Sequence, residues 1–142
     1  MYLLDTNVVS ELRKAGKADK NVSAWAASVS AASLFLSAIT ILELETGILL
    51  VQRRDPTQGA MLRTWLEGHV LPAFSGRILP VDVLVAQRCA KLHVPDPRSD
   101  RDALIAATAL VHSMTVVTRN TVDFRATGVV LRNPWDDTRL PS

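Results

Sequence analysis

Short apolar runs alternate with helical patterns along this chain. Apolar side chains follow one another closely in runs that predict buried strands at residues 1–5, 34–38, 77–81, 115–118 and 129–131. Between them, apolar residues recur at helical spacing and predict helices at residues 8–14, 22–30, 41–51, 59–70, 82–93 and 100–112. Strands that alternate with helices predict an α/β fold, in which a mainly parallel sheet has helices on both faces.

Polar residues ahead of the predicted helices indicate where those helices begin. The expected caps of the helices that start near residues 8, 41 and 100 are Thr6 or Asn7, then Thr40, then Ser99. No internal repeat or low-complexity segment interrupts the pattern. We therefore expect residues 1–135 to form one domain and residues 136–142 to form a flexible tail.

Composition narrows the class of protein only a little. The hydrophobic fraction of 48% and the charged fraction of 21% are ordinary for a globular domain. Cys89 is the only cysteine, so no internal disulfide forms, and its helical spacing with Val85 predicts a buried thiol. The start lacks a basic leader, and the longest apolar stretch, residues 34–42, is too short to span a bilayer. We expect a cytoplasmic protein with no membrane partner.

Four acids stand at junctions between the predicted elements. Asp5 closes the first strand, and parallel sheets of this class place ligands outside the carboxyl ends of their strands. Glu43, Asp102 and Asp123 follow or precede apolar elements in similar places. Brought together by the fold, four carboxylates would make a site for a hard divalent cation such as Mg²⁺ or Mn²⁺.

A purely structural interpretation of these acids competes with the shared site. Two segments match capping boxes, in which the acid returns to the cap residue's amide: Thr40-x-x-Glu43 and Ser99-x-x-Asp102. Asp123, together with Asn120, would likewise serve a turn or a helix start. Capping does not account for Asp5, which ends a strand, nor for a common edge of the sheet. The joint pattern favours a metal site, and hydrolysis of a phosphodiester is the natural chemistry of such a site.

Other catalytic classes lack their characteristic residues. The three histidines are too scattered for a zinc site, the glycines form no phosphate-binding loop, and no G-x-S-x-G nucleophile motif occurs. An aspartyl phosphatase or a phospho-receiver would carry a second acid near Asp5, where Asn7 stands instead. The remaining alternative is a catalytically silent module that binds RNA or protein.

The motifs around the four acids resemble those of one family. They are LLDTN at residues 3–7, ILELETG at 41–47, DALIAATA at 102–109 and VTRNTVDF at 117–124, and the closing VLRNPW at 130–135 adds to them. In this order they resemble a PIN domain, more narrowly the VapC-type toxins of bacterial toxin–antitoxin pairs. The resemblance implies a three-layer α/β/α sandwich, an endoribonuclease dependent on Mg²⁺ or Mn²⁺, a homodimer and inhibition by a cognate antitoxin.

The same resemblance assigns roles to particular residues. It implies that Asp5 and Asp102 are the main metal ligands, that Glu43 orients the attacking water, and that Asp123 binds directly or through water. Support around the acids is expected from four polar residues, Thr6, Asn7, Thr118 and Asn120. Two neighbouring acids leave the assignment open. Asp100 would replace Asp102 if its helix began late, whereas Glu45 is expected to face solvent.

Arginine supplies 12 of the 16 basic residues and suits the binding of phosphate. Arg119 is the leading candidate for an RNA contact, followed by Arg13 and Arg101, although each of them would also serve simply to solvate the surface. Trp25 and Trp65 are expected in the core or at a dimer contact, and one of their two helices is a candidate groove for the antitoxin.

Overall fold

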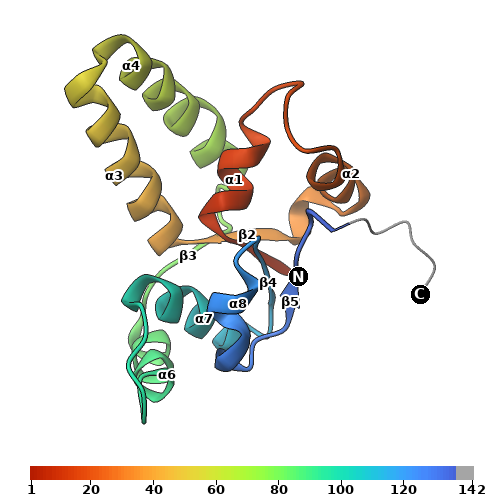
Figure 1. Cartoon of the computed structure of the whole chain (residues 1–142), viewed down its shortest axis with the longest axis vertical. Coiled ribbons are helices and arrows are strands. Elements are labelled where there is room, and N and C mark those ends of the chain that lie inside the picture. The colour runs from red at the N-terminus through yellow and green to blue at the C-terminus, as the bar shows by residue number, and fades with distance from the viewer. Residues whose placement is uncertain (137–142) are drawn as a thin grey trace.

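A computed structural model describes residues 1–136, and Figure 1 shows the arrangement of their helices and strands. The elements in chain order are β1 (Tyr2–Leu4), α1 (Thr6–Leu12), α2 (Lys20–Ser28), β2 (Leu34–Ser37), α3 (Ala38–Arg54), α4 (Pro56–Trp65), α5 (Leu71–Ala73), β3 (Ile78–Leu79), α6 (Val83–Leu92), α7 (Asp100–His112), β4 (Thr115–Val117), α8 (Thr121–Phe124) and β5 (Leu131–Arg132). Single 3₁₀ turns lie at Ala31–Ser33 and Arg125–Thr127, and a π-helical turn at Leu66–Val70 joins α4 to α5. Apart from Asp136, the predicted tail lies outside the described residues.

The five strands form one parallel sheet in the order β3-β2-β1-β4-β5. β1 is central, with Leu3 opposite Phe35 of β2 on one side and Val116 of β4 on the other. Every strand points the same way, so the carboxyl ends of β1, β2 and β4 lie along one edge. The predicted parallel α/β fold is confirmed, and that edge is where its ligands are expected.

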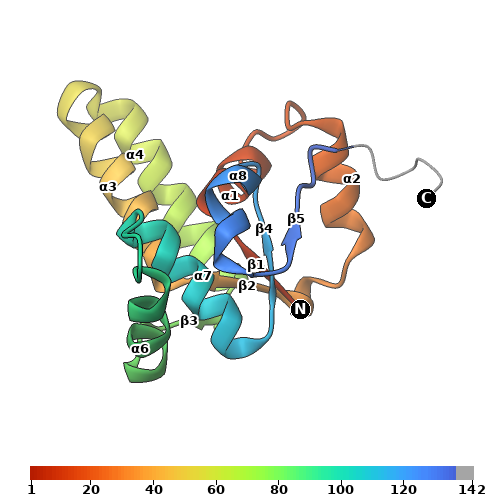
Figure 2. The ribbon, with the colours of Figure 1, turned by 60° about the horizontal axis from the view of Figure 1, so that its bottom comes forward.

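Alternating side chains of the strands pack against helices on both faces. Leu4, Leu36 and Val117 join a core cluster with residues of α1, α2 and α3. Their strand neighbours Leu3 and Val116 face the other way and pack against α7 and α8. The two clusters give the three-layer sandwich that the sequence predicts, visible from two directions in Figures 1 and 2.

Helices α3 and α4 form an antiparallel hairpin that projects from the sheet (Figures 1 and 2). Its two arms come very close where Gly59 of α4 meets Gln52 of α3. A Cβ atom added to Gly59 would lie 2.7 Å from the Gln52 Cα, well inside contact distance. Glycine is therefore required at this crossing.

Two of the predicted caps are wrong. Asp5 itself caps α1, because its Oδ1 accepts a hydrogen bond from the Thr6 amide at 2.8 Å, so neither Thr6 nor Asn7 has that role. Helix α3 begins at Ala38, where the Ser37 Oγ accepts from the Ile39 amide at 3.0 Å. In both cases a side chain at the end of the strand or directly after it accepts from an amide of the first helical turn, so the helix starts earlier than the apolar pattern indicates. Thr40 is consequently buried inside the helix.

Two other helices also begin earlier than predicted. The helix predicted at residues 59–70 starts at Pro56, which fits a first helical turn, after the cap Asp55. The helix predicted at 22–30 covers Lys20–Ser28 and is capped by Asp19. The last strand is Leu131–Arg132 instead of 129–131, and Asn120 precedes the short α8, so a helix start is the alternative that holds there.

Several predictions about the interior are confirmed. Cys89 is buried beside Val85. Trp25 lies in the core, edge-on to Tyr2 at 5.2 Å between ring centroids, whereas Trp65 is only partly buried against the same cluster. Within residues 1–136, no helix has the length and apolar character needed to cross a membrane.

Candidate active site

Asp5 and Thr118 follow the ends of two neighbouring strands, β1 and β4. Only 6% of Asp5 is exposed, and both of its carboxylate oxygens are held. Oδ1 accepts from the Thr6 amide at 2.8 Å, and Oδ2 accepts from the Thr118 hydroxyl at 2.8 Å. The carboxylate is therefore fixed in orientation at the carboxyl edge of the sheet.

Asn7 connects Asp5 to the loop after β4. Its Nδ2 lies 3.5 Å from Asp5 Oδ2 and 3.3 Å from the Thr118 hydroxyl, while its Oδ1 accepts from the Arg119 amide at 3.4 Å. The Asn120 amide donates to the Thr118 hydroxyl at 3.0 Å. The structure thus brings three of the predicted supporting residues into one network around Asp5, with Asn120 joining through its backbone.

The fourth supporting residue, Thr6, holds Glu43. The Thr6 hydroxyl donates to Glu43 Oε1 at 2.7 Å, across 37 positions of the chain, and also lies 3.3 Å from the Thr40 hydroxyl. Arg101 Nη1 approaches the other Glu43 oxygen at 3.9 Å. Because Glu43 sits in the second turn of α3 and contacts Thr6, the capping-box interpretation of Glu43 is wrong.

Asp102 lies in the first turn of α7 and Asp123 in α8. Ser99 precedes α7 as predicted, but its side chain makes no capping hydrogen bond within the described part of the chain. Asp102 is half-buried, and the exposed Asp123 is near enough for its charge to act on Asp102. The structure therefore places both acids at the same edge of the sheet as Asp5.

The four carboxylates share one electrostatic environment. Burial is the main cause that raises the pKa of Asp5, and the charges of Glu43 and Asp102 raise it further, against the hydrogen bonds from Thr118 and Thr6. Burial likewise raises the pKa of Asp102, followed by the charges of Asp123 and Glu43. Across residues 1–136, no three acidic, histidine or cysteine side chains converge closely enough to form a ready-made ion cage. Asp5 and Asp102 nevertheless lie close enough to other acids for charge to act on them, and carboxylate oxygens are the donor type that hard divalent cations prefer.

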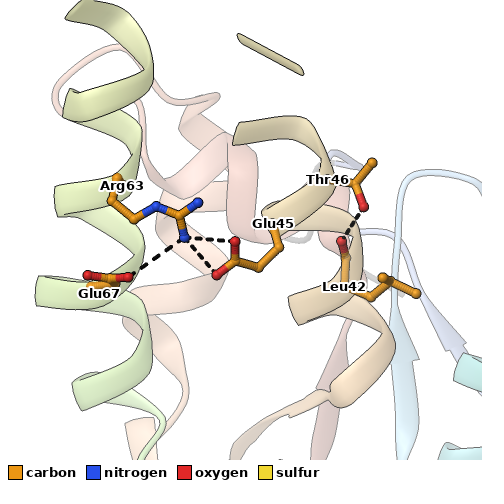
Figure 3. Close-up of polar contacts among 5 residues, drawn as sticks. All are labelled: Leu42, Glu45, Thr46, Arg63 and Glu67. Atoms are coloured by element: carbon orange, nitrogen blue, oxygen red, sulfur yellow. Dashed lines mark hydrogen bonds and ion pairs between the residues drawn. The ribbon is translucent and has the colours of Figure 1, made fainter. Parts of the chain in front are cut away.

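The two competing acids point elsewhere. Asp100 is exposed, and its Oδ1 lies 3.3 Å from His93 Nε2. Glu45 is not simply solvent-facing as expected, because both of its oxygens bind Arg63 Nη1 at 2.7 Å. Figure 3 shows this ion pair between α3 and α4, with Glu67 3.7 Å from the same nitrogen and the Thr46 hydroxyl donating to the Leu42 carbonyl nearby.

The three candidate arginines lie at different distances from the acids. Arg101 reaches Glu43, and the Arg119 amide bonds to Asn7 while its guanidinium carbon lies 5.2 Å from the centroid of the Trp135 ring. Arg13 stacks at 5.8 Å over Trp65 and borders a cleft of about 230 Å³ that also touches Glu43. The contact between Arg119 and Trp135 was not predicted from the sequence. The only local signal for it was the NPW motif at residues 133–135.

Comparison with known proteins gives a consistent result. Residues 2–130 match the PIN domain family. VapC ribonuclease Y4jK of Sinorhizobium fredii is 40% identical over 141 residues, which cover 96% of this chain and 99% of the relative. Toxin FitB of Neisseria gonorrhoeae is 41% identical over 143 residues, covering 96% and 100%.

Structural comparison agrees over the same length. The crystal structure of FitAcB from Neisseria gonorrhoeae superposes with a TM-score of 0.86 at 40% identity, covering 95% of this chain and 99% of that chain. The PIN-domain match spans all four acidic positions. The chain therefore belongs to the PIN-domain family, in the group that includes VapC ribonucleases and toxin FitB.

Proposed function

We propose that this protein is the toxin of a toxin–antitoxin pair and acts as a metal-dependent endoribonuclease. The observation that carries the proposal is the carboxyl edge of the sheet, where Asp5 follows β1 and where α3, α7 and α8 carry Glu43, Asp102 and Asp123. There the charges of Glu43 and Asp102 act on Asp5, and the charge of Asp123 acts on Asp102. Full-length relatives named VapC ribonuclease and toxin FitB support RNA as the substrate and toxicity as the cellular role.

The donor set suits Mg²⁺ or Mn²⁺. Asp5 and Asp102 would be the principal ligands, with Glu43 and Asp123 completing the oxygen donors. Burial, and after it the charges of neighbouring acids, raise the pKa of both Asp5 and Asp102, so their ionised forms are costly here, and a bound cation would offset that cost. A bound ion of this kind lowers the pKa of an attacking water and stabilises charge on a phosphodiester.

The chain's own residues set the geometry of the reaction. Thr118 and the Thr6 amide hold the two oxygens of Asp5, so this ligand is oriented before substrate arrives. The Thr6 hydroxyl occupies Glu43 Oε1, which leaves Oε2 as the oxygen that would accept a proton from the attacking water. Arg101, 3.9 Å from Oε2, is placed to exchange that contact for an RNA phosphate.

The proposal includes the partners of a toxin. A cognate antitoxin would bind this chain and block cleavage in the cell that produces it. The homodimer that the family resemblance implies is part of the same proposal, and the sedimentation or elution volume of the purified protein tests it. Arg13, which borders a cleft with Glu43, and Arg119, whose amide bonds to Asn7, are proposed RNA contacts.

The test is cleavage of total cellular RNA by the antitoxin-free protein with Mg²⁺, with Mn²⁺ and with EDTA. We expect discrete fragments that require the metal. Asp5→Asn and Asp102→Asn should fold normally and reduce kcat by at least ~100-fold, the scale on which removal of an essential group acts.

The matched control is Asp100→Asn, which removes an acid two positions from Asp102 that points away from the site. This variant should cleave RNA at the wild-type rate. Full cleavage by both Asp5→Asn and Asp102→Asn would overturn the site assignment. No cleavage by folded wild-type protein under any condition would favour a silent binding module.

A further inference from the structure

Arg119 lies between the acidic site and the end of the described chain. Its amide donates to Asn7 Oδ1, and Asn7 in turn contacts Asp5. Its side chain turns to Trp135, with 5.2 Å between the guanidinium carbon and the ring centroid. One residue therefore connects the edge of the sheet to the C-terminal tryptophan.

Trp135 is itself firmly held. Its carbonyl accepts from the Asn21 side chain of α2 at 2.8 Å, and its amide donates to Asn133 Oδ1 at 2.9 Å. The indole ring is partly buried against the core cluster that includes Val22 of α2. The ring is thus a fixed platform and not a mobile surface side chain.

The Arg119 guanidinium stacks on this platform, and among residues 1–136 no carboxylate lies within ion-pair distance of it. Glu11 is near enough to sense its charge, but both Glu11 oxygens are already bound, one by Lys14 at 2.9 Å and the other by the Asp19 amide at 2.9 Å. A stacked guanidinium keeps the N–H groups at its edge available, and those are the groups that bind a phosphate.

We propose that Trp135 is a positioning residue that holds Arg119 ready to bind an RNA phosphate beside the scissile one. The inference rests on the proposed ribonuclease function and specifies how that site grips its substrate. An unrestrained arginine loses rotamer freedom when it binds phosphate, and stacking on Trp135 removes much of that loss in advance. The role of Trp135 thus acts through Arg119 and not on the reacting atoms.

The test measures both the cleavage of RNA and the binding of RNA by this protein. Cleavage kinetics use otherwise wild-type protein, and fluorescence anisotropy of a labelled single-stranded RNA uses the non-cleaving Asp5→Asn background. We expect Arg119→Gln to raise KM and Kd roughly three- to ten-fold with kcat unchanged, the scale of one charge-assisted contact. It should also reduce the slope of log Kd against log salt by ~0.7, as expected for one lost phosphate contact on a single strand.

Trp135 is tested by two replacements that keep an apolar side chain. Trp135→Leu fills the position without an aromatic face and should raise KM in the same direction, whereas Trp135→Phe should stay close to wild type. The double variant Trp135→Leu with Arg119→Gln should bind no more weakly than Arg119→Gln alone, because Trp135 has no other route to the RNA. Arg88→Gln, on α6 at the far end of the molecule in Figure 1, controls for loss of one charge.

Thermal melting of each variant shows whether it is folded. Additive effects of Trp135→Leu and Arg119→Gln would overturn the proposal, as would a fall in kcat with KM unchanged. Equal weakening by Arg88→Gln would also overturn it, since net charge alone would then be responsible. If wild-type protein cleaves no RNA, the proposed function fails, while the binding measurements still decide the role of Trp135.

Discussion

At the scale of single residues, Asp5 and Asp102 hold their protons more tightly than ordinary acids. Burial is the main cause for both, and the charges of neighbouring acids raise each pKa further above the usual 3.8. Folded protein therefore binds more protons than unfolded protein in the range just above pH 3.8. Two ionised carboxylates at this edge are an electrostatic cost that the rest of the fold outweighs.

This cost predicts a dependence of stability on pH. Below pH 3.8, the pKa of an unfolded aspartate, both acids are protonated and the electrostatic cost is absent. The cost grows as pH rises towards the raised pKa values of Asp5 and Asp102 in the folded protein, and it is complete above those values. Asp5→Asn, which retains a side-chain oxygen to cap α1, should therefore lose less stability than wild type over that interval. Chemical denaturation at a series of pH values, without divalent metal, measures the difference. Identical pH profiles for the two proteins would contradict it.

The acids themselves were predictable from sequence, because strand ends and helix starts can be identified from local patterns. Their contacts were not. Thr6 binds Glu43 across 37 positions and Asn7 contacts Thr118 across 111. Such contacts depend on how the strands are ordered in space. The second role of Asp5, as the cap of α1, was missed because a strand end and a helix cap were treated as alternatives.

At the scale of elements, the α3–α4 hairpin positions Glu43 and depends on Gly59. Alanine is normally favoured over glycine in a helix by ~1 kcal/mol. At Gly59, however, the new Cβ would meet the Gln52 backbone at 2.7 Å, so the helices must separate. We expect Gly59→Ala to lower the free energy of unfolding by about 1–3 kcal/mol, the usual cost of overpacking, and denaturation in urea measures it.

The same hairpin contains its own control. Gly47 lies in α3 with nothing within 4 Å of an added Cβ, so Gly47→Ala should stabilise the protein by up to ~1 kcal/mol through helix propensity alone. Stabilisation by Gly59→Ala to the same degree would show that the close crossing does not constrain the hairpin.

The existence of the longer helices was predictable, but their length did not decide how well their ends were predicted. Helix α7 was predicted at its observed bounds and α6 to within a residue, whereas α3 extends three residues beyond the predicted 41–51 at each end. Strand β5 has two residues and α8 has four, too few for any periodicity to develop. The exact bounds of β5 and α8 follow from packing beside β4 and α7, which no local pattern contains.

At the scale of the whole molecule, the strand order creates the site. Placing β1 between β2 and β4 puts the residues after three strands on one edge, and the second turn of α3 and the first turns of α7 and α8 bring the remaining acids to it. Parallel α/β architecture was predictable, but this order was not, since several orders satisfy the same alternation of strands and helices. The site is thus a property of the folded chain that no segment has alone.

A ligand that binds only this assembled edge must stabilise the entire fold. Mn²⁺ or Mg²⁺ at a concentration 100-fold above its Kd should add about 2.7 kcal/mol to the free energy of unfolding, with a matching rise in Tm. The rise should disappear in Asp5→Asn and shrink in acid, where the carboxylates of Asp5 and Asp102 bind protons instead. Glu45→Gln, which removes an acid that is bound to Arg63 away from the site, should keep the full rise in Tm.

An equal rise in the Tm of Asp5→Asn would mean that the cation binds elsewhere. A wild-type protein whose Tm is unchanged by either metal would favour a silent binding module, because a functional ion site formed only on folding must be linked to stability.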